Sequence, residues 1–239
     1  MINTSLYKSI IYSKWIDTVY LFAQVRHLFQ FKAKFHSDEG EDKIIKLYLP
    51  EKTGRYLDIG AGHPMRGSNS YAFYKAGWTG TSIEPIRLMH TLHKSFRRRD
   101  RQVKGVIGQS NGLIKFYEFN PTEYSTISEN RYIEMRAQGM RERKSYLVEE
   151  VRLEEIIETV SPLDAYFVTI DVEGFDFSIL EQLADLNCRP RLICVEESVS
   201  TTKQIGSLLH ALGYILKSKT GNNGIYVHKV YLQQSKIYS

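Results

Sequence analysis

Tyr56-Leu57-Asp58-Ile59-Gly60-Ala61-Gly62 sets the architecture expected of the whole chain. An apolar run reaches an acid, and a Gly-x-Gly turn follows. Because glycine has no Cβ, the backbone there can turn sharply and come close to a ligand. The pattern predicts a β-strand whose carboxyl end opens onto a binding site.

A second apolar run, residues 79–83, ends in Glu84, which lies 24 residues after Gly60. A carboxylate at the tip of the second strand can accept hydrogen bonds from both hydroxyls of a ribose. Together the two features predict a nucleoside-containing cofactor on a parallel sheet. An ordinary strand and turn with a chance acid is the competing interpretation, and the position of Glu84 disfavours it.

The residues around the turn narrow the choice of cofactor. A dinucleotide fingerprint needs Gly or Ala where this chain has Met65, and no G-K-[ST] follows to form a phosphate loop. Asp58, just before the turn, suits a ligand that carries positive charge, and S-adenosylmethionine (SAM) fits best. The predicted cofactor contacts are Asp58, Gly60, Ala61, Gly62 and Glu84, with Gly108 and Gln109 near the adenine.

The composition describes a globular chain with one basic patch. Its 239 residues are 42% hydrophobic, enough for one domain of ordinary size or one domain with a small appendage. The formal charge of +5 is matched by residues 94–104 alone. Such a run is usually a solvated helix face, although it could attract an anionic substrate, a lipid headgroup or nucleic acid. No aromatic residues alternate with the basic ones, so we expect a solvated face and no nucleic-acid partner.

Cysteine content and hydropathy bear on the cellular location. The chain has two cysteines, Cys188 and Cys194, which fits a reducing compartment. The N-terminal apolar run contains Asp17 and lacks a signal-peptide cleavage site, and no uncharged apolar run reaches the ~18 residues of a membrane span. These features predict a cytoplasmic protein.

Alternating strand and helix patterns predict the domain organisation. Residues 37–239 read as one α/β domain with a mostly parallel, doubly wound sheet, closed by an antiparallel C-terminal edge hairpin that turns at residues 221–224. Residues 120–146 read as a lid or substrate loop with a short helix. Residues 1–36 are loosely helical and rich in aromatic and basic residues. They are expected to form a helical appendage that packs on the main domain, or that contacts a membrane surface or a second copy.

Carboxylates stand at the predicted carboxyl ends of the strands, where such sheets bind ligands. Either Asp171 or Glu173 could take the proton of an acceptor hydroxyl as a general base, and Glu173 could instead be a helix N-terminal acid. Asp171 with Glu196 could alternatively hold Mg²⁺. The six acids are Asp58, Glu84, Asp171, Glu173, Glu196 and Glu197.

Histidines supply weaker candidates. His63 follows the glycine turn and could act as a base, or it could shape the loop before Pro64. His90 and His93 are spaced for metal ligation on a helix, but no third ligand is near in sequence, so we expect exposed helix residues.

These segments together resemble the FkbM-type family of SAM-dependent methyltransferases. The resemblance covers roughly residues 37–230 and leaves out residues 1–36. Asp38 departs from it, because the family usually has Gln there. The matching segments are Ser37 to Asp42, Leu57 to Gly62, Ser68-Asn69, Gly77-Trp78, Ile83-Glu84-Pro85, Ser125-Thr126, Val151 to Ile156 and Ile170-Asp171-Val172-Glu173-Gly174.

The resemblance implies a Rossmann-like class I methyltransferase fold, with Ser68 and Asn69 added to the predicted cofactor contacts. It also implies methyl transfer to oxygen, often a sugar hydroxyl. The predicted function is therefore O-methylation of a sugar, glycan or glycosylated small molecule. The alternative is a catalytically inactive glycan- or membrane-surface-binding protein on the same fold. An NAD-dependent oxidoreductase is disfavoured by Met65.

Overall fold

The computed structural model describes residues 35–159 and 165–234. The predicted appendage, residues 1–36, lies almost entirely outside this range. Within the described residues, no helix combines the length and the apolar content that crossing a bilayer requires.

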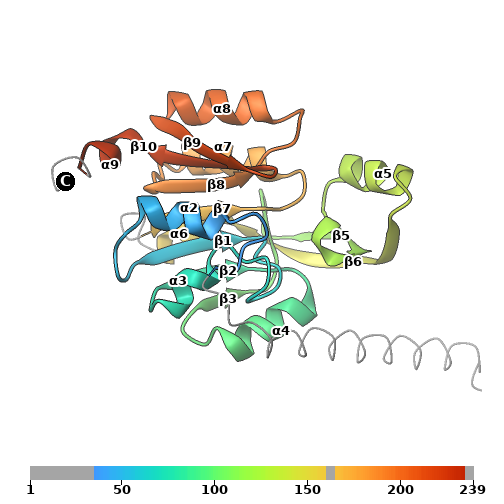
Figure 1. Cartoon of the computed structure of the whole chain (residues 1–239). Helices are drawn as coiled ribbons and strands as arrows, with labels where there is room; N and C mark the ends of the chain where they lie inside the picture. Colours follow the sequence, from blue (N-terminus) through green and yellow to red (C-terminus); the bar gives the residue numbers. More distant parts are fainter. Residues whose placement is uncertain (1–34, 160–164, 235–239) are drawn as a thin grey trace, which may run out of the picture. The chain divides into compact units, whose positions relative to one another are not determined.

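A seven-stranded sheet forms the centre of the domain, in the order β3-β2-β1-β7-β8-β10-β9 (Figure 1). All neighbouring pairs are parallel except those of β10, which runs antiparallel to both β8 and β9. The predicted doubly wound sheet with a C-terminal edge hairpin is confirmed, with β10 lying inside the sheet and β9 at its edge. The strands are β1 (Arg55–Ile59), β2 (Thr79–Ile83), β3 (Arg101–Val103), β7 (Ala165–Ile170), β8 (Leu192–Glu196), β9 (Tyr214–Thr220) and β10 (Asn223–His228).

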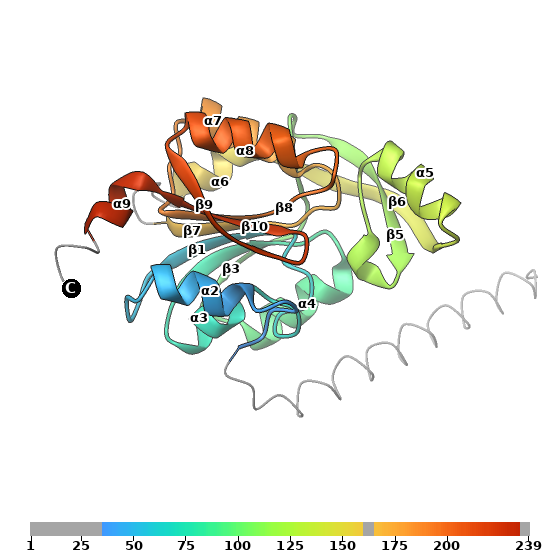
Figure 2. The ribbon, with the colours of Figure 1, turned by 45° about the horizontal axis from the view of Figure 1, so that its top comes forward.

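Helices cover both faces of this sheet, as Figure 2 shows. One face carries α2 (Glu41–Tyr48), α3 (Tyr71–Lys75) and α4 (Arg87–Phe96). The other carries α6 (Leu153–Thr159), α7 (Asp176–Asp185) and α8 (Thr202–Ala211), and α9 (Lys229–Gln234) follows β10. The layers are those of a three-layer α/β fold.

The central strand β7 shows why the sheet is buried on both faces. Its side chains alternate between the two cores: Phe167 packs with α2 and α3, whereas Val168 and Ile170 pack with α6, α7 and α8. Phe73 and Trp78 complete an aromatic group around Phe167, with ring centroids 4.7–5.9 Å apart. Burial of each such side chain contributes about 1.5–3 kcal/mol, so a near-continuous apolar run is what this position requires.

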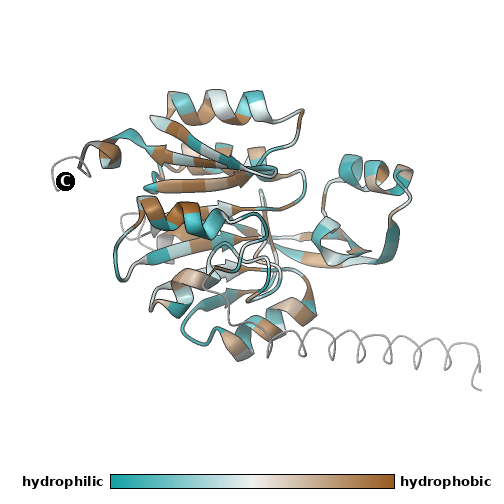
Figure 3. Cartoon of the chain, in the orientation of Figure 1, coloured by the Kyte–Doolittle hydropathy of each residue, from teal (hydrophilic) through white to brown (hydrophobic). Residues whose placement is uncertain are grey.

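A second sheet of three strands, in the order β4-β6-β5, extends from the domain. It consists of β4 (Val106–Gly108), β5 (Leu113–Asn120) and β6 (Arg141–Arg152), and the 3₁₀ turn η1 (Thr122–Tyr124) and α5 (Glu129–Ala137) lie between β5 and β6. We call residues 113–152 the arm. The expectation of a loop over residues 120–146 is wrong at its C-terminal end, which is a strand. The charged residues 141–144, teal in Figure 3, gave no apolar alternation because this strand lies outside the main sheet.

The chain changes direction at β1, which places the ligand crevice. β2 and β3 follow on one side of β1, and the chain then returns to β7 on the other side. Ile59, the last residue of β1, pairs with Ile170, the last residue of β7. The carboxyl ends of these two strands therefore meet at the point where such sheets bind their ligands.

Candidate functional site

The glycine turn lies directly against the end of β7. The Asp171 N–H donates to the Ile59 carbonyl at 3.0 Å, and a Cβ on Gly60 would overlap the carbonyl oxygen of Asp171. Gly60 also has φ +77°, and the Ala61 N–H donates to the Ile83 carbonyl of β2 at 3.1 Å. The structure thus brings the predicted cofactor turn and the predicted catalytic acid side by side.

Glu84 ties the tip of β2 to this turn. Its Oε2 accepts the Gly62 N–H at 2.8 Å and its Oε1 accepts the Ile86 N–H at 2.6 Å. Burial raises the pKa of Glu84 to about 8, with the two backbone hydrogen bonds acting in the opposite direction and Asp58 adding a smaller upward push. Each carboxylate oxygen has a second lone pair, so both can still accept a hydroxyl from a ligand.

Asp58 belongs to a buried ionic network below the turn. It accepts a hydrogen bond from Ser70, and Arg97 Nη1 lies 3.7 Å from its Oδ2. Arg97 is fully buried and also contacts Asp100 at 2.9 Å and the Tyr56 hydroxyl at 2.7 Å. Burial raises the pKa of Asp58, and Arg97 opposes that rise.

The expectation that residues 94–104 form a solvated face is therefore wrong for Arg97. The basic residues on either side of it, Lys94, Arg98 and Arg99, are exposed as expected. Arg97 differs because Asp58, Asp100 and Tyr56 together supply the partners that a buried guanidinium needs.

Ser68 and Asn69 hold the loop after the turn in place. Ser68 Oγ accepts the Tyr71 N–H at 3.1 Å, at the start of α3, and lies 3.4 Å from Arg97 Nη1. Asn69 Nδ2 donates to the Thr169 hydroxyl of β7 at 3.0 Å. Both side chains therefore connect this loop to its surroundings, and their contact with a cofactor stays a prediction.

Two histidines fasten the same region. His63 Nδ1 accepts the N–H groups of Met65 and Arg66, both at 3.1 Å, which places the ring proton on Nε2 and favours the loop-shaping role over that of a base. His93 Nε2 lies 3.1 Å from the Gly62 carbonyl. His90 and His93 are both buried, so the expectation of exposed helix residues is wrong.

Three carboxylates converge at the ends of β7 and β8. Ligand oxygens of Asp171, Glu173 and Glu196 lie within 4.8 Å of one another, which is close enough for them to share one cation. Burial first, and then the neighbouring acids, raise the pKa of Asp171 well above its usual range and those of Glu173 and Glu196 to about 7. Water reaches Asp171, yet protein surrounds its carboxyl group closely enough to cause this shift.

The turn that carries Glu173 is strained and well braced. Glu173 has φ +55°, a left-handed conformation that non-glycine residues rarely adopt, and Gly174 follows with φ +99°. Asp176 accepts the N–H groups of Val172 and Gly174, both at 3.0 Å. Arg131 of α5 donates to Glu173 Oε2 from Nη2 at 2.8 Å and from Nε at 3.1 Å. Backbone strain of this kind is concentrated at functional sites.

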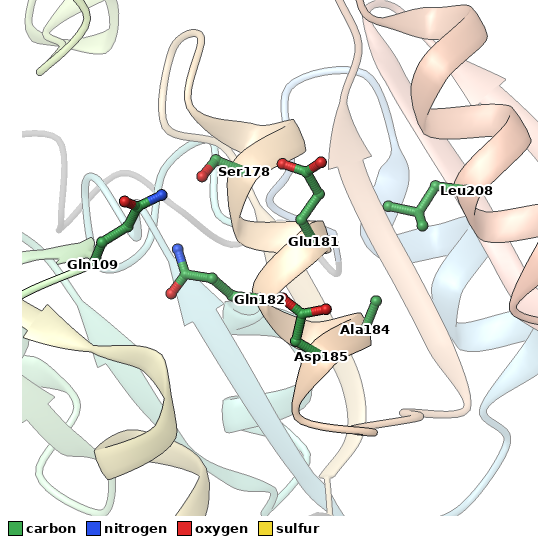
Figure 4. A pocket seen from close by; sticks show the side chains of 7 residues that line it. All are labelled: Gln109, Ser178, Glu181, Gln182, Ala184, Asp185 and Leu208. Atoms are coloured by element: carbon green, nitrogen blue, oxygen red, sulfur yellow. The ribbon is translucent and has the colours of Figure 1, made fainter.

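Gly108 and Gln109 lie at the base of the arm. Gly108 pairs with Arg152 in the β4–β6 ladder. Gln109 lines an open hollow of about 410 Å³ over α7 and α8, where its amide group faces that of Gln182 (Figure 4). None of the other predicted cofactor residues lines this hollow, so a role of Gln109 near the adenine stays a prediction. The hollow is lined by Gln109, Ser178, Glu181, Gln182, Ala184, Asp185 and Leu208.

Comparison with known families identifies the family of this chain. The family model of the methyltransferase FkbM domain matches residues 58–216, which include the glycine turn, Glu84 and the three carboxylates. The chain belongs to the FkbM methyltransferase family. The protein is therefore a SAM-dependent methyltransferase, and the resemblance inferred from its sequence is confirmed. A comparison with curated proteins gives no match.

Solved structures similar to this FkbM methyltransferase share little sequence with it. Monomeric WbdD is 12% identical (TM-score 0.46), with 80% of this chain and 41% of that one covered. A TehB-like SAM-dependent methyltransferase from Corynebacterium glutamicum is 11% identical (TM-score 0.45), with 89% and 100% covered. The METTL16 MTase domain is 12% identical (TM-score 0.45), with 79% and 65% covered. The strand order and the family match, rather than these likenesses, assign the class I methyltransferase fold.

The residues at the crevice fit the cofactor of an FkbM methyltransferase. The space beside Gly62 is open where a Cβ would stand, so a ligand can lie against bare backbone. Glu84 keeps acceptor capacity for ribose hydroxyls. The glycine turn and Glu84 would hold SAM, which supplies an electrophilic methyl group on a sulfonium. Ser70 and Arg97 already occupy the Asp58 carboxylate, so its contact with the cofactor stays a prediction.

Sequence reasoning missed three residues that shape this site: His93, Arg97 and Arg131. His93 follows Met89 by one helical turn, so it shares the buried face of α4. Asp100, the one acid in the basic run, was a signal for a buried partner of Arg97. Arg131 gave no signal, because it comes from a charged segment without apolar periodicity.

Proposed function

We propose that this FkbM methyltransferase transfers a methyl group from SAM to a hydroxyl of a sugar, glycan or glycosylated small molecule. The observation that supports it best is the contact between the Gly60 turn and Asp171, with Glu173 and Glu196 close by. A methyl group presented at the turn would face a group of proton acceptors. A hydroxyl needs such an acceptor, because its oxygen becomes a stronger nucleophile as the proton leaves.

The chain's own residues would perform the reaction by alignment and proton transfer. A bond forms between the acceptor oxygen and the methyl carbon while the carbon–sulfur bond breaks, and the hydroxyl proton passes to a carboxylate. Asp171 is the first choice for that base, because it adjoins the turn. Glu173 is the second choice, since its pKa of about 7 suits a base near neutral pH. Alignment of the reactants supplies much of the acceleration in such a transfer.

The test uses SAM labelled in its methyl group and an extract of surface glycans. Wild type should transfer label to the extract, and Asp171→Asn should lose the transfer while it still binds SAM in a calorimeter. Glu149→Gln is the matched control, because Glu149 is an exposed acid on β6. Absence of label with wild type under any metal condition would contradict the proposal and favour a binding protein that has lost catalysis.

Mg²⁺ at Asp171 and Glu196 stays a prediction. The three carboxylates could bind such a cation, and they could equally share protons, because burial and the neighbouring acids raise their pKa values. The same labelling assay with EDTA separates the two cases.

A further inference from the structure

The arm carries α5 as a firmly held unit. Tyr117 and Phe119 of β5 form a small buried core with Met135 of α5, and the rings of Tyr117 and Tyr132 stack at 4.2 Å. α5 lies between β5 and β6 in the sequence, and both views place it beside these strands at the outer end of the arm (Figures 1 and 2). The start of α5 is therefore fixed relative to the arm. A segment that contacts it is held in place by the arm.

That start contacts the strained turn after β7. The Thr126 hydroxyl donates to the Glu173 carbonyl at 2.8 Å, and Thr126 is itself held by two backbone hydrogen bonds to Tyr117. Ser128 caps α5 by accepting the Arg131 N–H at 3.3 Å. The Arg131 Cβ also lies 3.5 Å from where a Cβ of Gly174 would stand, so the two backbones approach closely.

We infer that Arg131 is a positioning residue of the acceptor site, and that through it the arm forms one wall of that site. The inference rests on the proposed function, because it assigns a role at the same three carboxylates. The hydrogen bonds from Nε and Nη2 of Arg131 both go to Glu173 Oε2. No donor among the described residues bonds Glu173 Oε1, so this oxygen can accept a hydrogen bond from the hydroxyl that is to be methylated.

The negative charge of the three carboxylates explains why position 131 carries a guanidinium. Asp171, Glu173 and Glu196 repel one another at their short separation, and a cation beside Glu173 reduces that repulsion. Arg131 binds Oε2 through two donors that lie in one plane, and this fixes the direction of the carboxylate. The positive charge of Arg131 also favours the ionised form of Glu173. Its other partner, Glu134 at 3.3 Å, has a side chain that is 61% exposed, so that contact contributes little.

The first test measures hydrogen–deuterium exchange and needs no acceptor. Arg131→Gln should increase exchange at residues 171–175 as well as at residues 126–133, because the turn loses the contact that holds it. Arg136→Gln is the matched control: Arg136 is an exposed arginine on the same helix, and it bonds the Met140 carbonyl instead. Unchanged exchange at residues 171–175 in Arg131→Gln would overturn the inference.

The second test uses label transfer into the glycan extract. Arg131→Gln should lower transfer roughly tenfold or more, as expected for a misplaced catalytic group, while SAM affinity by calorimetry stays that of wild type. Arg131→Lys should recover part of the loss, because it restores the charge without the planar donors. Equal transfer by Arg131→Gln and wild type, or an equal loss in Arg136→Gln, would overturn the role. If wild type itself transfers no label, the proposed function fails and the exchange experiment alone decides on Arg131.

Discussion

Arg97→Met should destabilise the domain strongly, even though Arg97 lies in a run of surface arginines. Its side chain is 0% exposed, 2.9 Å from Asp100 and 3.7 Å from Asp58. Removal of one partner from a buried ion pair costs about 3–5 kcal/mol, because the opposite charge stays buried without compensation. For a domain of this size, that corresponds to a fall in Tm of about 6–20 °C.

Urea unfolding of wild type and variant measures this cost, with Arg98→Met as the control. Arg98 is an exposed neighbour in the same run, so its substitution should change the free energy of unfolding by less than about 0.5 kcal/mol. A cost below about 1 kcal/mol for Arg97→Met would refute the reasoning. It would mean that Asp58 and Asp100 take up protons when the guanidinium is removed, so that the site does not depend on Arg97.

Three further outcomes follow from the site. Gly60→Ala should lower the free energy of unfolding in urea by several kcal/mol, because its Cβ overlaps the Asp171 backbone. Gly62→Ala has open space around it and should lose only the ~1–2 kcal/mol of a left-handed residue. Equal losses would contradict the close approach of Gly60 to Asp171. Burial raises the pKa of Glu84 to about 8, above its unfolded value of about 4.3, so the folded state binds more protons and stability should fall as pH rises from about 5 to 8. Glu84→Gln should flatten part of that fall, and an unflattened profile would show that the pKa is not raised. EDTA should abolish label transfer if Mg²⁺ binds Asp171 and Glu196, and unchanged turnover would remove the metal prediction.

The elements that sequence reasoning predicted are those whose pattern is local. A few residues of sequence are enough to recognise each of three features: the Gly60 turn, the acid at the end of β2 and the apolar run of β7. The parallel sheet follows from them, because strands that alternate with helices leave few other arrangements. The closing hairpin was predicted from its turn, since Gly221 to Gly224 lie between two apolar runs.

The features that sequence reasoning missed depend on contacts between distant segments. Arg97 is buried only because Tyr56, Asp58 and Asp100 meet around it, and nothing in its own neighbourhood shows this. β6 pairs outside the main sheet, so its exposed charged residues resemble a loop. Arg131 reaches Glu173 across 42 positions of the sequence, through a helix with no apolar periodicity.

Calorimetric titration of SAM into wild type and Glu84→Ala tests most directly whether the acid at the tip of β2 holds the cofactor. With its pKa of about 8, Glu84 is mostly neutral at pH 7, and a hydrogen bond between neutral groups contributes about 0.5–1.5 kcal/mol, so loss of two should weaken binding roughly fivefold to a hundredfold. Circular dichroism should show the variant folded, which excludes global unfolding as the cause of the loss. SAM binding of equal affinity to Glu84→Ala and wild type would contradict the cofactor site described above.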